Sequence, residues 1–222
     1  TRGCGNGRGL AWLPPGRERC APMPQLLSLS RTYVARGGAP RVHAVDAAIF
    51  ASAYFARCMA CSWCGDWCCS HGVDVDGTVA MALLARAPAI EARTGVPRGE
   101  WFEGPPEADA EMPGGSVRRA RVHQGGCVFR ARQGRGCTLH ALAIETGEDY
   151  HLLKPMASTL FPVTWGDGAL LLSDELEDGT LVCAGDGPSA YDAAREELAW
   201  YFGDALVAEL DALSRTSRRG AA

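Results

Sequence analysis

The sequence lacks the short motifs that identify several large enzyme classes. It contains no G-x-S-x-G nucleophile elbow, no Walker phosphate loop and no G-x-G-x-x-G dinucleotide fingerprint. Nucleophile-elbow hydrolases, P-loop enzymes and Rossmann enzymes therefore have no support. An internal repeat of about 20–50 residues, which is typical of solenoids and propellers, is missing as well.

Long apolar runs and basic blocks are also missing. The longest apolar stretches, such as the one that ends in Ala169–Leu172, are far too short to cross a bilayer. The net charge is −4, and no basic block stands out beyond the short pair Arg218 and Arg219. We therefore expect neither a nucleic-acid partner nor a membrane partner. Hydrophobic residues make up 47% and charged residues 22%, which is enough for an ordinary globular core.

The sequence also lacks the pattern of a secretion signal. The chain does not open with the basic and then apolar segments of a signal peptide. Residues 1–22 are rich in Gly, Arg and Pro and have no periodicity, so we interpret them as a disordered or upstream-translated lead with Met23 as the natural start. Its two cysteines, Cys4 and Cys20, are then incidental. We expect residues 23–222 to form one domain in the cytoplasm, where disulfides are rare.

Cysteine, in contrast, is abundant and crowded. Residues 58–69 read "CMACSWCGDWCC", so five of the ten cysteines stand within twelve positions. A reducing compartment and the strain of a bridge between the adjacent Cys68 and Cys69 disfavour disulfides. The C-x-x-C pairs lack the βαβ surroundings of a thioredoxin-like redox motif. The pattern therefore favours metal binding.

The class of metal follows from the ligand type and the spacing. Cys58, Cys61, Cys64 and Cys68 have the C-x₂-C-x₂-C-x₃-C spacing of bacterial ferredoxins, except that Cys69 replaces the expected proline. This spacing is compatible with a [4Fe–4S] cluster, and the same thiols suit tetrahedral Zn²⁺. Soft thiolates favour both over magnesium or calcium. The residues alone leave zinc and iron–sulfur open.

Three further cysteines lie downstream of this run. Two of them flank a Gly-rich turn, and the third follows a predicted strand. The complete set of candidate metal ligands is Cys58, Cys61, Cys64, Cys68, Cys69, Cys127, Cys137 and Cys183. Eight thiols exceed what one Zn²⁺ uses. Either two metals bind, or some of these cysteines are bystanders.

The remaining polar candidates are weaker. His71 lies two residues past Cys69, where it is placed to act as a ligand or as a neighbour of one. We expect the other histidines to be packed or exposed without a role in a site. Three carboxylates near the cysteine run are expected to be solvated in turns or at helix caps, namely Asp66, Asp74 and Asp76.

The predicted fold class is α+β, as a small cysteine-rich, metal-organised domain with a short antiparallel sheet and flanking helices. Apolar residues at helical spacing predict helices over residues 45–57, 77–94, 137–153 and 189–215, the last of them amphipathic. The expected N-caps are Asp46, Asp76 and Ser189. Gly95 is expected to end the second of these helices, and Gly147 to break the third. Gly203 is expected to divide the fourth.

The strands are predicted in the middle of the chain and near its C-terminal third. They cover residues 73–75, 117–123, 126–130 and 168–176. A turn at residues 132–136 is expected to return the chain to Cys137. Residues 103–116, rich in Pro, Gly and acid, are predicted to be a loop, and the Pro-bounded residues 154–163 are predicted to be irregular.

An ordered series of motifs resembles a known family. The series is "CSWCGDWCC", "GGCVF", "GRGCTLH", "KPMASTLFPV" and "LVC", within a span of about two thirds of the chain. It resembles the zinc- or iron-chelating family named for its C-x-x-C-x-x-C-C pattern, also called YkgJ-like. The resemblance implies metal ligands at Cys61, Cys64, Cys68, Cys69, Cys127, Cys137 and Cys183. Where the family usually has one more cysteine, this chain has Ser158, so a second site would be one thiolate short.

The function that these residues predict is an intracellular metal-binding protein with a thiolate zinc or iron–sulfur centre. A metal ion is the expected partner, and no substrate is implied. One alternative is an iron–sulfur redox enzyme or a methyltransferase, because flagellin lysine N-methylases share a related cysteine block. A methyltransferase needs a cofactor pocket, for which the sequence has no glycine-rich signature. The other alternative is a metal trafficking or storage module, which would expose labile thiols.

The resemblance predicts that Ser158→Cys raises metal stoichiometry or affinity, because zinc and iron prefer a thiolate to a neutral hydroxyl. Elemental analysis of the purified protein checks this. Cys68→Ser is the control and should lower metal occupancy sharply. A folded Ser158→Cys protein with no gain in bound metal would count against a place for residue 158 among the ligands.

Overall fold

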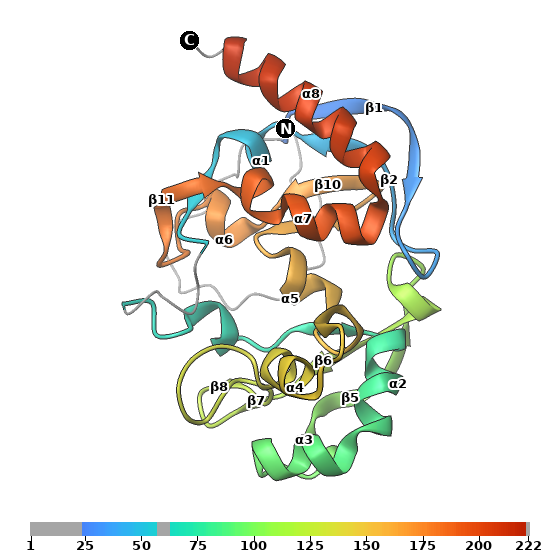
Figure 1. The fold of residues 1–222 in the computed structure, drawn as a ribbon, viewed down its shortest axis with the longest axis vertical. Helices are drawn as coiled ribbons and strands as arrows, with labels where there is room; N and C mark the ends of the chain where they lie inside the picture. The colour runs from blue at the N-terminus through green and yellow to red at the C-terminus, as the bar shows by residue number, and fades with distance from the viewer. Residues whose placement is uncertain (1–23, 57–62, 221–222) are drawn as a thin grey trace, which may run out of the picture.

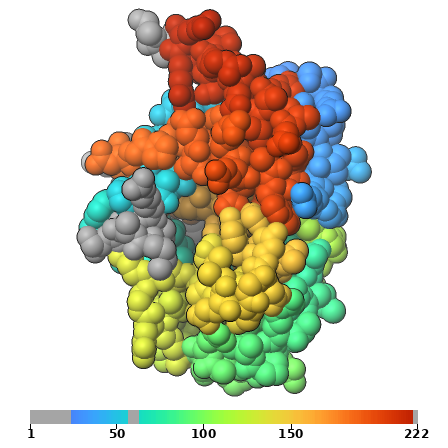
Figure 2. All heavy atoms as spheres, in the orientation of Figure 1, coloured from blue at the N-terminus to red at the C-terminus, as the bar shows by residue number. Residues whose placement is uncertain are grey.

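The computed structural model describes residues 24–56 and 63–220, and their secondary structure is a mixture of helices and small sheets (Figure 1). The prediction of an α+β fold is confirmed. The buried hydrophobic residues fall into two separate clusters. We call the part built from residues 24–56 and 156–220 the upper lobe, and the part built from residues 63–155 the lower lobe. The space-filling view shows the two ends of the chain above and its middle below (Figure 2).

The main sheet of the upper lobe joins two distant parts of the chain. β1 (Leu26–Val34) pairs antiparallel with β2 (Arg41–Asp46), and β2 pairs parallel with β10 (Ala169–Leu172). β10 in turn pairs antiparallel with β9 (Val163–Gly166). The sequence analysis did not identify β1. Only Leu29 and Tyr33 of its nine residues are buried, and the exposed Arg31 interrupts the apolar alternation between them.

The helices of the upper lobe pack beside this sheet. α7 (Ala190–Phe202) begins where the Ser189 hydroxyl accepts a hydrogen bond from the Asp192 amide at 3.1 Å, as the predicted N-cap requires. Gly203, with φ 84° and ψ 165°, separates α7 from α8 (Asp204–Gly220). This conformation is open to glycine and strained for other residues. The predicted division of the C-terminal helix at Gly203 is confirmed.

The lower lobe has a three-stranded antiparallel sheet in the order β4 (Asp74–Asp76), β6 (Ser116–Ala120) and β5 (Phe102–Ala108). A short hairpin of β7 (Val122–His123) and β8 (Gly126–Cys127) follows. These elements confirm the strands predicted near residues 73–75 and 117–123. The strand predicted at 126–130 is shorter than expected.

The helices of the lower lobe begin or end at the residues predicted to cap them. α2 (Gly77–Ala85) begins where the Asp76 carboxylate accepts a hydrogen bond from the Val79 amide at 2.9 Å. The predicted helix over 77–94 is interrupted at Arg86, and α3 (Ala87–Thr94) continues to Gly95. Pro88 explains the break, because proline lacks an amide donor for a helix interior but fits a first turn. α4 (Thr138–Thr146) ends at Gly147, as predicted.

The helix predicted over residues 45–57 is wrong in most of its length. Within the described residues 45–56, α1 (Ala48–Ala51) is the only helix, although the Asp46 carboxylate does accept a hydrogen bond from the Ala48 amide at 3.0 Å. The flanking residues belong to sheets: Val45 pairs with Leu170, and β3 (Ala53–Tyr54) pairs with β11 (Ala184–Ser189). Tertiary pairing has overridden the local helical spacing.

Two predicted irregular segments also form regular structure. Residues 103–116 contribute most of β5, which includes Pro105 and Pro106. β5 tolerates them because it is an edge strand whose pairing with β6 shifts register between Glu103 and Glu107. Residues 154–163 contain α5 (Met156–Leu160), which buries Met156 and Leu160. Among the described residues, no helix is both long and apolar enough to cross a membrane.

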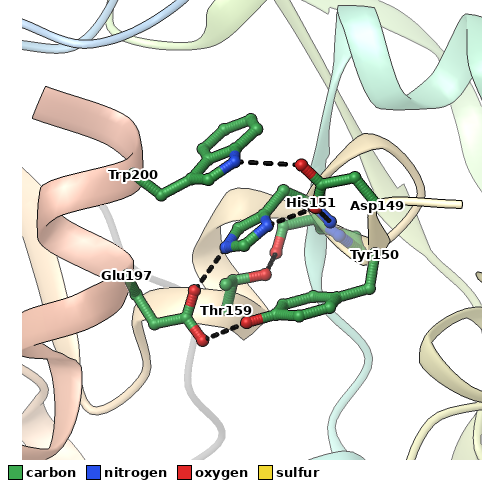
Figure 3. Close-up of polar contacts among 7 residues, drawn as sticks. Asp149, Tyr150, His151, Thr159, Glu197 and Trp200 are labelled. Atoms are coloured by element: carbon green, nitrogen blue, oxygen red, sulfur yellow. Dashed lines mark hydrogen bonds and ion pairs between the residues drawn. The ribbon is translucent and has the colours of Figure 1, made fainter. Parts of the chain in front are cut away.

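A polar network joins the two lobes (Figure 3). His151, on η5 (Tyr150–Leu152) of the lower lobe, directs Nδ1 to Asp149 and Nε2 to Glu197 of α7, each at 2.5 Å. Its ring is stacked between the rings of Tyr150 and Trp200, with 4.1 Å between centroids in both cases. The Tyr150 hydroxyl donates to Glu197 at 2.7 Å, and the Trp200 indole donates to Asp149 at 3.0 Å.

Asp149 accepts hydrogen bonds from the Trp200 indole and the His151 backbone amide. Glu197 accepts one from Tyr150, and the His151 ring contacts both carboxylates. Partial burial works against ionisation of Asp149, but the bonds from His151 and Trp200 outweigh it and lower the pKa of this carboxyl. For Tyr150, burial and the bond to Glu197 raise the pKa of the hydroxyl, which stays a neutral donor. The network is therefore a set of charge-assisted bonds between η5 and α7.

We predict that Glu197→Gln destabilises the protein by about 1–3 kcal/mol, because it keeps the shape of the side chain but removes the charge that Tyr150 and His151 contact. Chemical unfolding in urea measures the change, as a lower midpoint at an unchanged slope. Glu196→Gln is the matched control, since Glu196 is the exposed neighbour on the same helix. Equal stability of the two variants would show that the network does not hold the lobes together.

Candidate metal centre

The candidate ligands come from three parts of the chain. Cys58 and Cys61 lie in residues 57–62, outside the described residues. The other six predicted ligands are described, and each of them is partly buried: Cys64, Cys68, Cys69, Cys127, Cys137 and Cys183. Partial burial places these thiols near the surface but not fully exposed on it.

The described part of the cysteine run, from residue 63 onward, folds into tight turns. Cys68 and Cys69 belong to η2 (Trp67–Ser70), a single turn of 3₁₀ helix. The Trp67 amide donates to the Cys64 carbonyl at 3.0 Å, and the Cys69 amide donates to the Asp66 carbonyl at 2.8 Å. Asp66 has φ 57°, a left-handed conformation that Asp tolerates better than most side chains. These turns bring the backbone of Cys64 next to the start of η2.

The second group of cysteines lies beside η2. β8, which ends in Cys127, contacts η2 directly. Cys137 pairs with Arg130 in an isolated antiparallel bridge, so the predicted turn does return the chain. Burial raises the pKa of the Cys127 thiol to about 11, and the charge of Cys137 adds to the rise. Arg130 links the two cysteines, because its amide donates to the Cys127 carbonyl at 2.8 Å and its backbone pairs with Cys137.

The third part is Cys183, which belongs to the upper lobe. Its carbonyl accepts a hydrogen bond from the Phe55 amide at 2.8 Å, just before the cysteine run begins. Cys183 and Cys68 pack against the hydrophobic core of the upper lobe. Cys127 and Cys137 pack against that of the lower lobe. The candidate ligands thus border both cores.

The thiols have the donor chemistry for zinc or iron–sulfur, but the described ones do not form a complete site. Within residues 24–56 and 63–220, no group of three or more Cys, His, Asp and Glu side chains is arranged to hold a metal ion. Cys58 and Cys61, half of the ferredoxin-like spacing, stand outside these residues. The prediction of a metal centre therefore stays a prediction.

The weaker candidates have other roles in the structure. His71 is exposed and packs edge-on against Trp67, with 4.7 Å between ring centroids. Asp74 forms a half-exposed ion pair with Arg119 at 3.2 Å. Ser158, the position that resembles a family cysteine, lies half-buried on α5.

The prediction that Asp66 and Asp76 are solvated is wrong. Their exposed fractions are 6% and 3%. Asp76 is buried as the cap of α2, and this burial raises the pKa of its carboxyl. Asp66 contacts Arg135, whose guanidinium Nη2 donates to Asp66 Oδ1 at 2.9 Å and to Cys64 Sγ at 3.0 Å.

Sequence reasoning did not identify Arg135 as part of the site. Its only signal was its place two residues before Cys137, in the "GRGC" motif. The Gly136 amide adds a bond of 3.4 Å to Asp66 Oδ2, so both carboxylate oxygens face the segment that leads to Cys137. Comparison of the chain with family models, with curated proteins and with solved structures finds no match, so the candidate centre stands on its own residues.

Proposed function

We propose that this chain is a metal-binding protein that holds zinc or an iron–sulfur cluster through cysteine thiolates. Its candidate ligands are the eight cysteines named from the sequence, and membership of the CxxCxxCC family is part of the proposal. The observation that carries it is convergence. η2, with Cys68 and Cys69, contacts β8, with Cys127, which Arg130 links to Cys137.

Packing alone does not require cysteine at these positions, because Ala or Val would serve as well. Thiols from separate segments can instead share a metal, which binds their deprotonated form. When bound, a zinc ion or cluster would supply cross-links between segments that belong to different hydrophobic cores. The partial burial of the six described thiols favours such a structural centre over a trafficking module, whose thiols would be exposed.

The identity of the metal is tested by elemental analysis and by the visible spectrum of protein purified without oxygen. Broad visible absorbance together with bound iron indicates an iron–sulfur cluster. A colourless protein that contains zinc indicates a zinc centre. Protein that contains neither metal, and that cannot be loaded with either, would contradict the proposed function.

Removal of the metal is expected to loosen the fold, because thiolate–metal binding free energies are of order 10 kcal/mol. We predict a lower melting temperature after chelation under reducing conditions, measured by circular dichroism. Cys127→Ser should have the same effect in part. Cys20→Ser is the matched control, since Cys20 belongs to the lead, and it should change neither metal content nor melting temperature. An unchanged melting temperature after chelation would mean that the centre is not structural.

A further inference from the structure

An ion pair joins two of the segments that carry candidate ligands. Asp66 stands between Cys64 and Cys68 in the chain, and Arg135 stands two residues before Cys137. Only 9% of the Asp66 side chain and 23% of the Arg135 side chain are exposed. An ion pair that is mostly shielded from water is screened less than a surface pair and has more defined geometry. It therefore fixes the position of one segment relative to the other without a metal.

The same guanidinium also contacts a candidate ligand. Arg135 Nη2 lies 3.0 Å from Cys64 Sγ, which is within hydrogen-bond distance for sulfur. Its Nε is buried and has no hydrogen-bond partner among the described residues, so the group keeps a further donor. One guanidinium nitrogen contacts both Asp66 and Cys64, and it therefore restricts where the Cys64 side chain can lie.

Arginine suits this position better than lysine. The planar guanidinium offers several donors in a fixed fork, so one group can hold the Asp66 carboxylate and the Cys64 sulfur together. Asp66 in turn reaches the Gly136 amide at 3.4 Å. Arg132, in the same turn, is exposed. The two arginines of this turn therefore have different surroundings.

From these contacts we propose that Arg135 and Asp66 are positioning residues for the thiolate centre. Their ion pair aligns the segment of Cys64 and Cys68 with the segment of Cys137 before metal binds, and the same guanidinium holds the Cys64 side chain beside Asp66. This inference rests on the proposed function. Loss of groups that orient metal ligands typically lowers metal affinity by about 10–100-fold, which is the effect expected for Arg135→Gln.

The test uses the full chain in four forms: wild type, Arg135→Gln, Arg135→Lys and the control Arg132→Gln. Zn²⁺ is the probe, titrated against a chromophoric chelator under anaerobic, reducing conditions. We expect Arg135→Gln to bind Zn²⁺ about 10–100-fold more weakly. Arg135→Lys should recover part of the loss, since it keeps the charge but not the fork. Arg132→Gln should match wild type.

A second measurement needs no metal. Hydrogen exchange of the metal-free protein should become faster in Arg135→Gln around residues 64–70 and 131–137, and should stay unchanged in the α7 and α8 helices. This readout separates loss of alignment from general unfolding. If Arg135→Gln does not fold, Asp66→Asn takes its place, because it removes the charge of the pair and keeps the shape of the side chain.

The outcomes distinguish the two proposals. Wild-type protein that binds neither zinc nor iron would overturn the proposed function and this inference with it. Wild type that binds Zn²⁺ while Arg135→Gln, or Asp66→Asn in its place, binds equally well would overturn only the positioning role. Weaker binding together with faster exchange confined to the two segments supports it. Faster exchange throughout the chain would assign the ion pair to general stability and overturn the inference.

Discussion

The parallel pairing of β2 with β10 is the contact on which the architecture depends. It places Ala44 and Val45 beside Ala169 and Leu170, and neither Val45 nor Leu170 has any exposed surface. The chain between these strands must leave the upper lobe and return to it. The core of the lower lobe is built entirely from this excursion. Closure of so long a loop costs conformational entropy, which the burial of apolar side chains in the upper core offsets.

The excursion leaves the upper lobe after β3 and returns to it at α5, and polar contacts lie near both of these places. The outward crossing leads from β3 to η2, where Asp66 and Arg135 form their ion pair. The return crossing leads from η5 to α5, where His151 contacts Glu197 of α7. The Asp66–Arg135 pair lies within the lower lobe, whereas the His151–Glu197 contact joins the two lobes. The second contact therefore depends on the return of the chain to the upper lobe.

The sequence predicts best what neighbouring residues decide. The caps at Asp76 and Ser189 and the helix ends at Gly95 and Gly203 depend on a few consecutive side chains, and all four are found where expected. The sheet pairing of Val45 with Leu170 was missed because the two residues lie far apart in the chain. The same distinction holds for the candidate site. The cysteines can be chosen as candidates from their residue type, but the contact between Asp66 and Arg135, 69 residues apart in the chain, cannot be predicted from the sequence.

The separation of the two cores also has a consequence for the order in which the protein is made. The lower core draws on residues from Val75 to Leu153, a continuous stretch of chain. The upper core cannot close until Leu170 and the C-terminal helices have left the ribosome. Since domains form as their residues emerge, the lower lobe can fold first, with Cys127 and Cys137 already in place. Cys183, which packs against the upper core, takes its place only after that core has closed.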